Sequence, residues 1–349
     1  MERLEYFVRR LLLVVPTFIG ITALVFALIQ FVPGGPVEQM LVRMRRFGSG
    51  ETAAKSARAS VVLSEEYRKQ LEKHFGFDLP LHRRYLKWLV TDRLGLRMQS
   101  YKFPNKTVWQ LIRERFPVSL VFGLTGFVLT YAICIPLGIA KALRHGSTFD
   151  IATSVAVFVG YAIPPLALGM VMRMLFCGTV EGLWDIFPLG GLESDNFATL
   201  SLAAKIADRF RHMFLPVLCY VIGDFAILTI LMKNSLLEQI SKDYVRAVIA
   251  RGGSLRRAVW GHAFRNSLIP IATGFGRVLS LFFAGSVIIE QIFEIPGMGR
   301  LSIEAAIGRD YAVFMGILSL TSLLALLGNV LSDFCYMLID PRIHFGREP

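Results

Sequence analysis

Length, composition and charge already restrict what this chain can be. Its 349 residues are 54% hydrophobic, with a mean hydropathy of +0.53, and several apolar runs reach about 20 residues. This is more apolar sequence than a soluble core of this size needs, so we expect an all-α polytopic membrane protein. We attribute the formal charge of +12 to basic loops beside membrane segments, and expect no nucleic-acid binding.

Six segments have the length and apolarity that a membrane-spanning helix needs. They cover residues 11–32, 118–140, 151–177, 214–232, 268–289 and 311–338. The first follows a basic start and contains no small-x-small cleavage site, so we expect a retained span and not a removed signal peptide. An even number of spans puts both termini on one side. Basic short loops at 141–150 and 233–267 place that side in the cytoplasm.

These spans divide the chain into four parts. We expect the N-terminus and first span over 1–32, a periplasmic helical insertion over 33–117, a five-span core over 118–338 and a cytoplasmic tail over 339–349. The insertion holds 17 Lys or Arg against eight acids. Loops longer than about 60 residues cross the membrane largely regardless of charge, so the predicted orientation stands.

Composition and periodicity divide the insertion further. Residues 43–62 are rich in Arg, Gly, Ser and Ala, which is typical of a mobile segment. We expect one helix to begin after Ser64 and to end at Gly76, and a second helix to begin after Pro80. Along one side of the second helix lie Tyr85, Trp88 and Leu89.

Charged residues and helix breakers lie inside the predicted spans. Asp224 in the fourth span and Arg277 in the fifth lie at depths that differ by about 3 Å. A charge inside a bilayer is costly, so the two residues pair with each other or each face a water-filled path. Pro164 and Pro165 interrupt the third span, which fits simple kinked packing as well as the broken helices of a transporter.

The sequence lacks the motifs of several active sites. It contains no Gly-x-x-x-x-Gly-Lys-Ser/Thr phosphate loop, no His-Glu-x-x-His metal motif and no Gly-x-Ser-x-Gly elbow. The four cysteines lie in or beside apolar segments without Cys-x-x-Cys spacing, so we expect buried small residues and neither a metal site nor a disulfide. We expect this chain to be no enzyme and to hold no cofactor of its own.

The loop at 233–267 is the most informative stretch. It carries seven Lys or Arg against two acids. From Asp243 the pattern predicts a helix in which Ala247 and Ala250 share one face, and Gly252 with Gly253 ends it. Small residues allow another surface to approach closely. Such a helix can dock into a groove of a partner protein or rest on anionic lipid, and the residues alone leave both open.

Four stretches, spread in order over almost the whole chain, resemble one known family. Asp243-Tyr-Val-Arg-Ala-Val-Ile-Ala-Arg-Gly252, followed by His262-Ala-Phe-Arg-Asn-Ser-Leu-Ile-Pro270, is similar to the coupling loop of binding-protein-dependent ABC importer permeases of the dipeptide and oligopeptide group. The other three are Arg9-Arg10-Leu-Leu-Leu13 with Phe31-Val-Pro-Gly-Gly-Pro36, Glu290 to Leu301 with Arg309-Asp310-Tyr311, and Asn329 to Ile343.

Two details of this resemblance refine it. The pair Gly34-Gly35 is similar to the Yej-type permeases, linked to peptide and microcin C import, where many relatives have Gly-Asp. The general permease motif begins Glu-Ala-Ala, whereas Arg246-Ala247-Val248 stands here. Contacts with an ATPase would therefore depend on the small residues and the flanking arginines.

The resemblance implies an assembly and a set of functional residues. The expected partners are a second homologous permease subunit, two ATP-binding subunits that carry ATP and Mg, a periplasmic substrate-binding protein and the lipid of a bacterial inner membrane. ATPase coupling is assigned to Asp243, Tyr244, Arg246, Ala247, Ala250, Arg251 and Gly252, with support from His262, Arg265, Asn266 and Pro270.

Two further sets of residues complete the predicted site. Asp224 and Arg277 are candidates for the pathway. The C-terminal stretch places polar side chains on one face of the last helix, where we expect an anchor to a neighbouring loop. These anchor residues are Asn329, Asp333, Asp340 and Arg342.

The substrate and the energy source leave alternatives open. Peptides are the expected cargo, while glutathione and nickel chelates are carried by similar permeases. An ion-coupled secondary transporter that uses Asp224 and Arg277 is a rival of another class. A membrane scaffold or receptor is a third reading, and it predicts no uptake defect when the chain is deleted.

Overall fold

The computed structural model describes residues 2–31, 79–103, 105–272, 274 and 286–339. Contacts divide the chain into two compact units. Unit 1 comprises residues 1–14, 115–301 and 323–349, and unit 2 comprises residues 15–114 and 302–322. In the described ranges the regular structure is helical, apart from isolated β-bridges between Gln99 and Thr107 and between Cys177 and Asp185. The expected all-α class is confirmed for this part of the chain.

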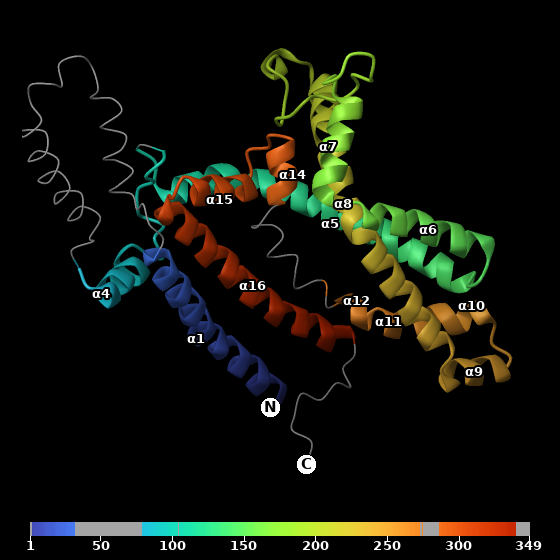
Figure 1. Cartoon of the computed structure of the whole chain (residues 1–349). Coiled ribbons are helices and arrows are strands. Elements are labelled where there is room, and N and C mark those ends of the chain that lie inside the picture. The colour runs from blue at the N-terminus through green and yellow to red at the C-terminus, as the bar shows by residue number, and fades with distance from the viewer. Residues whose placement is uncertain (1, 32–78, 104, 273, 275–285, 340–349) are drawn as a thin grey trace, which may run out of the picture. The chain divides into compact units, whose positions relative to one another are not determined.

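Long helices carry most of the described sequence (Figure 1). They are α1 (Glu2–Gln30), α5 (Val108–Leu143), α6 (Thr148–Ala162), α7 (Pro165–Phe176), α8 (Leu202–Ile240) and α16 (Tyr311–Ile339). The shorter α-helices are α4 (Leu81–Leu86), α9 (Asp243–Ala250), α10 (Leu255–Ala258), α11 (Phe264–Ser267), α12 (Ile269–Ala272), α14 (Val287–Ile292) and α15 (Met298–Ile307). Single turns of π-helix cover Lys87–Thr91 and Val259–Ala263, and a 3₁₀ turn covers Phe197–Thr199.

Four described helices are long and apolar enough to cross a membrane, namely α1, α5, α8 and α16. They contain most or all of the predicted spans 11–32, 118–140, 214–232 and 311–338. Outward apolar side chains such as Leu12 and Val155 are more than half exposed, as lipid-facing positions are. Most of the predicted span 268–289 lies outside the described residues.

The predicted third span, 151–177, is not one straight helix. Helices α6 and α7 meet at an angle of 94°, and they count as a fifth candidate span if the bent pair crosses as one. Pro165 has no N–H to bond to the preceding turn, and a proline disfavours helical geometry in the residue before it. Ile163 and Pro164 are accordingly extended, with ψ of 120° and 137°. Pro136 and Pro216, in contrast, lie inside continuous helices.

Unit 1 has two clusters of buried apolar residues. The Phe293 core joins α5, α7, α8 and α14 and includes Phe122, Leu168, Leu215 and Ile292. The Val245 core joins α5, α8, α9 and the turn after α10 and includes Ile139, Ala142, Met232, Leu236 and Val259. Cys134, Cys177 and Cys219 are buried and Cys335 is half-buried, and all four are free thiols. Three cysteines therefore behave as the predicted buried small residues.

Unit 2 contains the described end of the insertion. Helix α4 begins directly after Pro80, as predicted, and Trp88 is buried. The Tyr85 hydroxyl lies 2.8 Å from Thr22 Oγ1, and its ring lies 5.5 Å from that of Phe26, both on α1. The helix predicted after Ser64 and the segment 43–62 lie outside the described residues. Within unit 2 the insertion is thus joined to the first span by hydrogen bonding and aromatic packing.

Candidate functional site

Helix α9 (Asp243–Ala250) begins at Asp243, as the sequence predicts. Lys242 precedes it with an extended backbone, and Gly252 follows it with a φ of +84°. The Gly253 N–H donates to the Val248 carbonyl at 3.0 Å, which satisfies a carbonyl of the last turn. A side chain at position 252 would be strained at this φ, so glycine sets the end of the helix.

One face of α9 is packed onto the membrane helices. Val245 is 1% exposed and belongs to the Val245 core, and Tyr244 and Val248 pack against that core. The Tyr244 hydroxyl donates to Gln239 Oε1 at 2.8 Å and accepts from Asn266 Nδ2 at 3.3 Å. The two parts of the sequence motif, residues 243–252 and 262–270, therefore meet at Tyr244. Its side chain faces inward and holds the helix in place.

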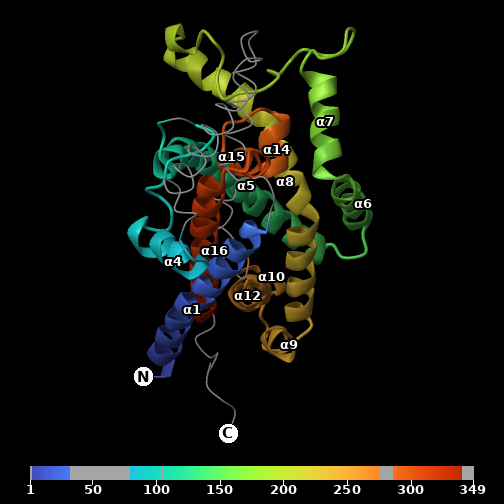
Figure 2. The same cartoon turned by 60° about the vertical axis from the view of Figure 1, so that its left-hand side comes forward.

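The opposite face of α9 is open to solvent. Its exposed members include Asp243, Arg246, Ala247 and Ala250, which lie three or four residues apart along the helix. Ile249 is 44% exposed beside them and adds an apolar side chain that the sequence motif left unassigned. These exposed residues (Asp243, Arg246, Ala247, Ile249 and Ala250) form what we call the α9 surface. Figures 1 and 2 show α9 itself beyond the end of α8 and beside α10.

The surroundings of the α9 surface are strongly basic. The exposed basic side chains are Lys242, Arg246, Arg251, Arg256, Arg257 and Arg265. Asp243 lies 3.8 Å from Arg246 and Glu238 lies 3.1 Å from Lys242, but these pairs are exposed and hold the helix only weakly. A partner with an acidic groove complements this surface, and so does anionic lipid.

The residues predicted to support the loop have different positions. Asn266 reaches Tyr244, Pro270 lies half-buried in α12, and His262 and Arg265 are exposed. A residue that the prediction omitted, Ser267, is fully buried, and its carbonyl accepts a hydrogen bond from Ser235 Oγ on α8 at 2.9 Å. The Asn266-Ser267 pair thus fixes the loop to both α9 and α8.

The other predicted site residues are only partly within the described chain. Asp224 is exposed on α8, and Arg277 lies outside the described residues, so their pairing stays a prediction. Asp333 on α16 forms an ion pair with Arg10 on α1, and the expected anchor to a neighbouring loop stays a prediction. Asn329 is exposed, and Asp340 and Arg342 lie outside the described residues.

Glu290 has a structural role that the motif alone did not reveal. Its carboxylate is buried and accepts hydrogen bonds from Ser119 Oγ and from the Arg300 N–H, each at 2.8 Å. Ser119 Oγ in turn accepts from the Met298 N–H at 2.7 Å. A Cβ on Gly297 would lie 2.3–2.4 Å from the carboxylate, so the glycine is needed for this close approach.

The environment of Glu290 changes its acidity. Burial raises the pKa of its carboxyl group, and the hydrogen bonds from Arg300, Ser119 and Gly299 and the charge of Arg115 oppose that rise. The carboxylate therefore depends on neutral donors that tie α14 and α15 to α5. The sequence signal for this site is the spacing of Gly297 and Gly299 after Glu290, which by itself indicates only the family resemblance.

Long apolar helices able to cross a membrane, one of which ends at an exposed helix with basic surroundings, are typical of an integral membrane protein. The chain belongs to the family described as "Binding-protein-dependent transport system inner membrane component", whose model matches residues 134–345. That match contains α6 to α12, the α9 surface and Glu290.

Full-length relatives agree with this membership. The "Peptidoglycan transport system permease protein YejB" of Agrobacterium fabrum is 40% identical, with 98% of this chain and 99% of the relative covered. The "Inner membrane ABC transporter permease protein YejB" of Escherichia coli O157:H7 is 38% identical over the same shares. The "Dipeptide transport system permease protein DppB" of Escherichia coli K12 is 32% identical, with 99% and 100% covered. The predicted resemblance to this group, and to its Yej-type members, is confirmed.

Proposed function

We propose that this chain is a permease subunit of an ATP-driven importer that brings peptides across a bacterial inner membrane. The family membership and the names of the relatives, which describe transport permeases, support the transport role. We further propose six spans with both termini in the cytoplasm. The single observation that carries the energy-coupling part is the α9 surface, an exposed docking face on a helix whose other face is buried at Val245.

The proposed assembly contains two permeases, two ATP-binding subunits and a substrate-binding protein. ATP and Mg would be held by the ATP-binding subunits, and this chain would be their non-enzymatic membrane partner. Closure of the ATP-binding subunits would move α9, and the Val245 core would carry the movement into α5 and α8. Differential contacts at α9 would thereby shift the bundle between outward and inward openings.

Substitutions on and beside α9 test whether ATP hydrolysis is coupled to uptake through this helix. Ala247→Glu puts a bulky charge on the docking face, and Gly252→Pro forces a negative φ where the chain needs +84°. Both variants should insert and assemble, but uptake of labelled peptide per ATP hydrolysed should fall about tenfold. Ala203→Glu on the exposed start of α8 is the matched control and should behave as the unmodified chain. Normal uptake by both α9 variants would overturn the coupling assignment.

Reconstitution separates this proposal from the rival classes. Uptake into liposomes should require ATP, the ATP-binding subunits and the binding protein. Uptake driven by an ion gradient with this chain alone would instead identify a secondary transporter. If deletion leaves uptake unchanged, the chain is a scaffold or receptor.

The partner binding protein gives the test of the substrate class. One relative is named for peptidoglycan transport and another for dipeptides. Calorimetry of the purified binding protein should therefore detect short peptides or peptide-bearing peptidoglycan fragments. Binding of glutathione or a nickel chelate, with no binding of peptides, would replace peptides as the proposed cargo.

A further inference from the structure

A buried cluster of charges joins α5, α6 and α8. Lys233 Nζ donates to both carboxylate oxygens of Asp150 at 2.8 Å. Lys141 Nζ lies 3.1 Å from the same carboxylate and donates to the Asp150 carbonyl at 2.8 Å, to Thr153 Oγ1 at 2.9 Å and to Ser154 Oγ at 2.7 Å. We name Lys141, Asp150 and Lys233 the Asp150 clamp, since one residue comes from each helix.

The Asp150 clamp is shielded from solvent. Its side chains are 1% exposed for Lys141, 6% for Asp150 and 14% for Lys233. Buried charges are retained when they are paired and their remaining hydrogen-bonding groups are satisfied, which is the case here. A further donor, the Gly146 N–H, lies 3.1 Å from the carboxylate. The exposed His145 ring lies 3.3 Å from the same oxygen, at the edge of the cluster.

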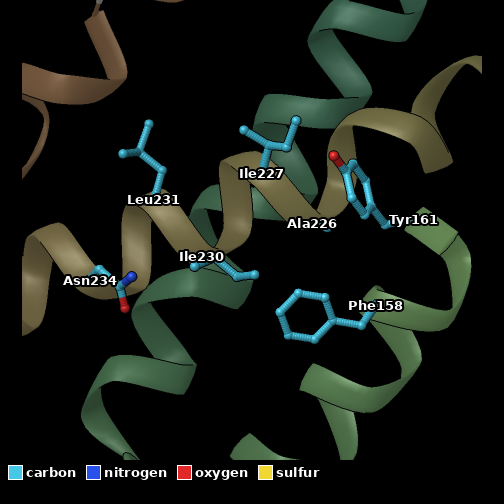
Figure 3. A pocket seen from close by; sticks show the side chains of 7 residues that line it. All are labelled: Phe158, Tyr161, Ala226, Ile227, Ile230, Leu231 and Asn234. Carbon is cyan, nitrogen blue, oxygen red and sulfur yellow. The ribbon is translucent and has the colours of Figure 1, made fainter.

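The Asp150 clamp holds the start of α6. Among its 15 residues, all of which the structure describes, Asp150 alone is buried. Further along, an open groove of about 350 Å³ separates α6 from α8. Figure 3 shows Phe158 of α6 pointing into this groove opposite Ile230 of α8. The two helices are therefore tied by charge at the start of α6, and they approach closely again at Gly160, where an added Cβ would lie 3.2 Å from Ile222 Cγ2 on α8.

The Asp150 clamp adjoins the apolar cluster that holds α9. Lys141 lies between Ile139 and Ala142 in the sequence, and both belong to the Val245 core. Lys233 follows Met232, another member of that core. A displacement of α9 that moves the core also moves the two lysines, and the start of α6 is held to them by Asp150, with Thr153 and Ser154 as further acceptors for Lys141.

We propose that the Asp150 clamp transmits the movement of α9 to α6, with Asp150 and Lys233 as positioning residues. This inference rests on the proposed function of α9 as the site at which ATP-binding subunits act. Movement of α9 pulls Lys141 and Lys233, and the start of α6 follows because its carboxylate is bonded to both. The remainder of α6 follows its start because the helix is continuous to Ala162, and the bend before α7 carries the displacement on.

The test measures this movement directly in the complete importer. Spin labels are placed at Val159 on α6 and Ile288 on α14, both exposed, in a background in which the half-buried Cys335 is replaced by Ser. Pulsed electron paramagnetic resonance then compares the label distance without nucleotide and after trapping with ATP and vanadate. The unmodified clamp should give a shift in the mean distance, and no transported solute is needed for the measurement.

Two sets of variants isolate the Asp150 clamp. The triple variant Asp150→Asn, Lys141→Met and Lys233→Met removes every charge of the clamp and the bonds of Lys141 to α6, so that no lysine is left buried without its carboxylate. Most of the distance shift should be lost. If this variant fails to assemble, Lys233→Gln serves, because it keeps a hydrogen bond without the charge. Lys233→Arg should retain the shift, and so should Glu114→Gln, which removes an exposed ion pair to Lys106.

The outcomes distinguish a failure of the Asp150 clamp proposal from a failure of the proposed role of α9 in coupling. A full shift in an assembled clamp variant, together with loss of the shift in Ala247→Glu, overturns the role of the Asp150 clamp and leaves the α9 assignment in place. An intact shift in Ala247→Glu overturns the α9 assignment and the clamp's role with it. Loss of the shift in both, with retention in Lys233→Arg, supports the proposal.

Discussion

Asp150 and Glu290 are both buried carboxylates in unit 1, yet they are stabilised in opposite ways. Asp150 meets two ammonium groups at distances of 2.8 and 3.1 Å. Glu290 meets a hydroxyl and backbone N–H groups, and no cation forms an ion pair with it among the described residues. One carboxylate joins helices through charge, and the other through hydrogen bonds to neutral donors.

The difference predicts how each site responds to change. Removal of one partner from a buried ion pair leaves an uncompensated charge, which costs more than the intact pair contributes. Neutral donors around Glu290 can still bond to an uncharged acceptor, so neutralising that group costs less. Substitutions at the two sites should therefore differ most in the stability of the purified complex.

Asp150→Asn should have the largest effect. It leaves Lys141 and Lys233 without their shared carboxylate, and we expect a loss of about 3–5 kcal/mol in folding free energy. The measurement is the apparent melting temperature of the detergent-solubilised complex, compared with that of Asp150→Asn combined with Lys233→Met. A double variant as unstable as the single one would show that the unpaired Lys233 is not the cause.

Gly299→Ala should come next. A Cβ there would lie 2.8 Å from backbone atoms of Val287, so α14 and α15 must separate. We expect a loss of about 1–3 kcal/mol, typical of overpacking. Gly20→Ala in α1 is the control, because a Cβ there meets nothing within 4 Å and alanine favours the helix. Equal melting temperatures for the two variants would contradict the tight packing proposed for the Glu290 site.

Glu290→Gln should cost about 1 kcal/mol, because the amide oxygen can accept from the Arg300 N–H. It should also remove a pH dependence. A carboxyl group with a raised pKa binds more protons when folded, so its contribution to stability falls as pH rises from its ordinary pKa of 4.5 through the raised value. As pH falls through this window, the melting temperature of the unmodified complex should rise relative to that of Glu290→Gln. A constant difference between them would contradict the raised pKa.

Glu114→Gln should have the smallest effect. The side chains of Lys106 and Glu114 approach to 2.7 Å but are 45% and 49% exposed, so solvent screens the pair. We expect a change below about 0.5 kcal/mol in the same melting assay. A loss as large as that of Asp150→Asn would show that burial does not explain the difference between the ion pairs.

The sequence predicted the features that depend on local pattern. Apolar length located four of the helices able to cross a membrane, and Gly252 correctly marked the end of α9. The prolines at 164 and 165 were recognised as breaks, but not the 94° angle, because the direction of the chain after a break depends on packing.

What the sequence could not show were partnerships between distant residues. Lys141 and Lys233 were counted as loop charges that orient the chain, whereas the structure buries them against Asp150. Eighty-three residues separate Asp150 from Lys233, and no periodicity links them. The roles of Ile249 and Ser267 were also not predicted. Ile249 is exposed and Ser267 is buried, and both positions depend on tertiary contacts that the local sequence does not show.

Helix α8 has a mechanical consequence that follows from its length alone. Its 39 residues extend about 58 Å, nearly twice the thickness of a bilayer's hydrocarbon core. After Pro216 the helix continues without another proline to Ile240, over about 36 Å. A tilt of about 5° about one end of such a rod displaces the other end by about 3 Å. Helix α8 is therefore a lever, and small rotations near the membrane centre become side-chain-sized movements at α9.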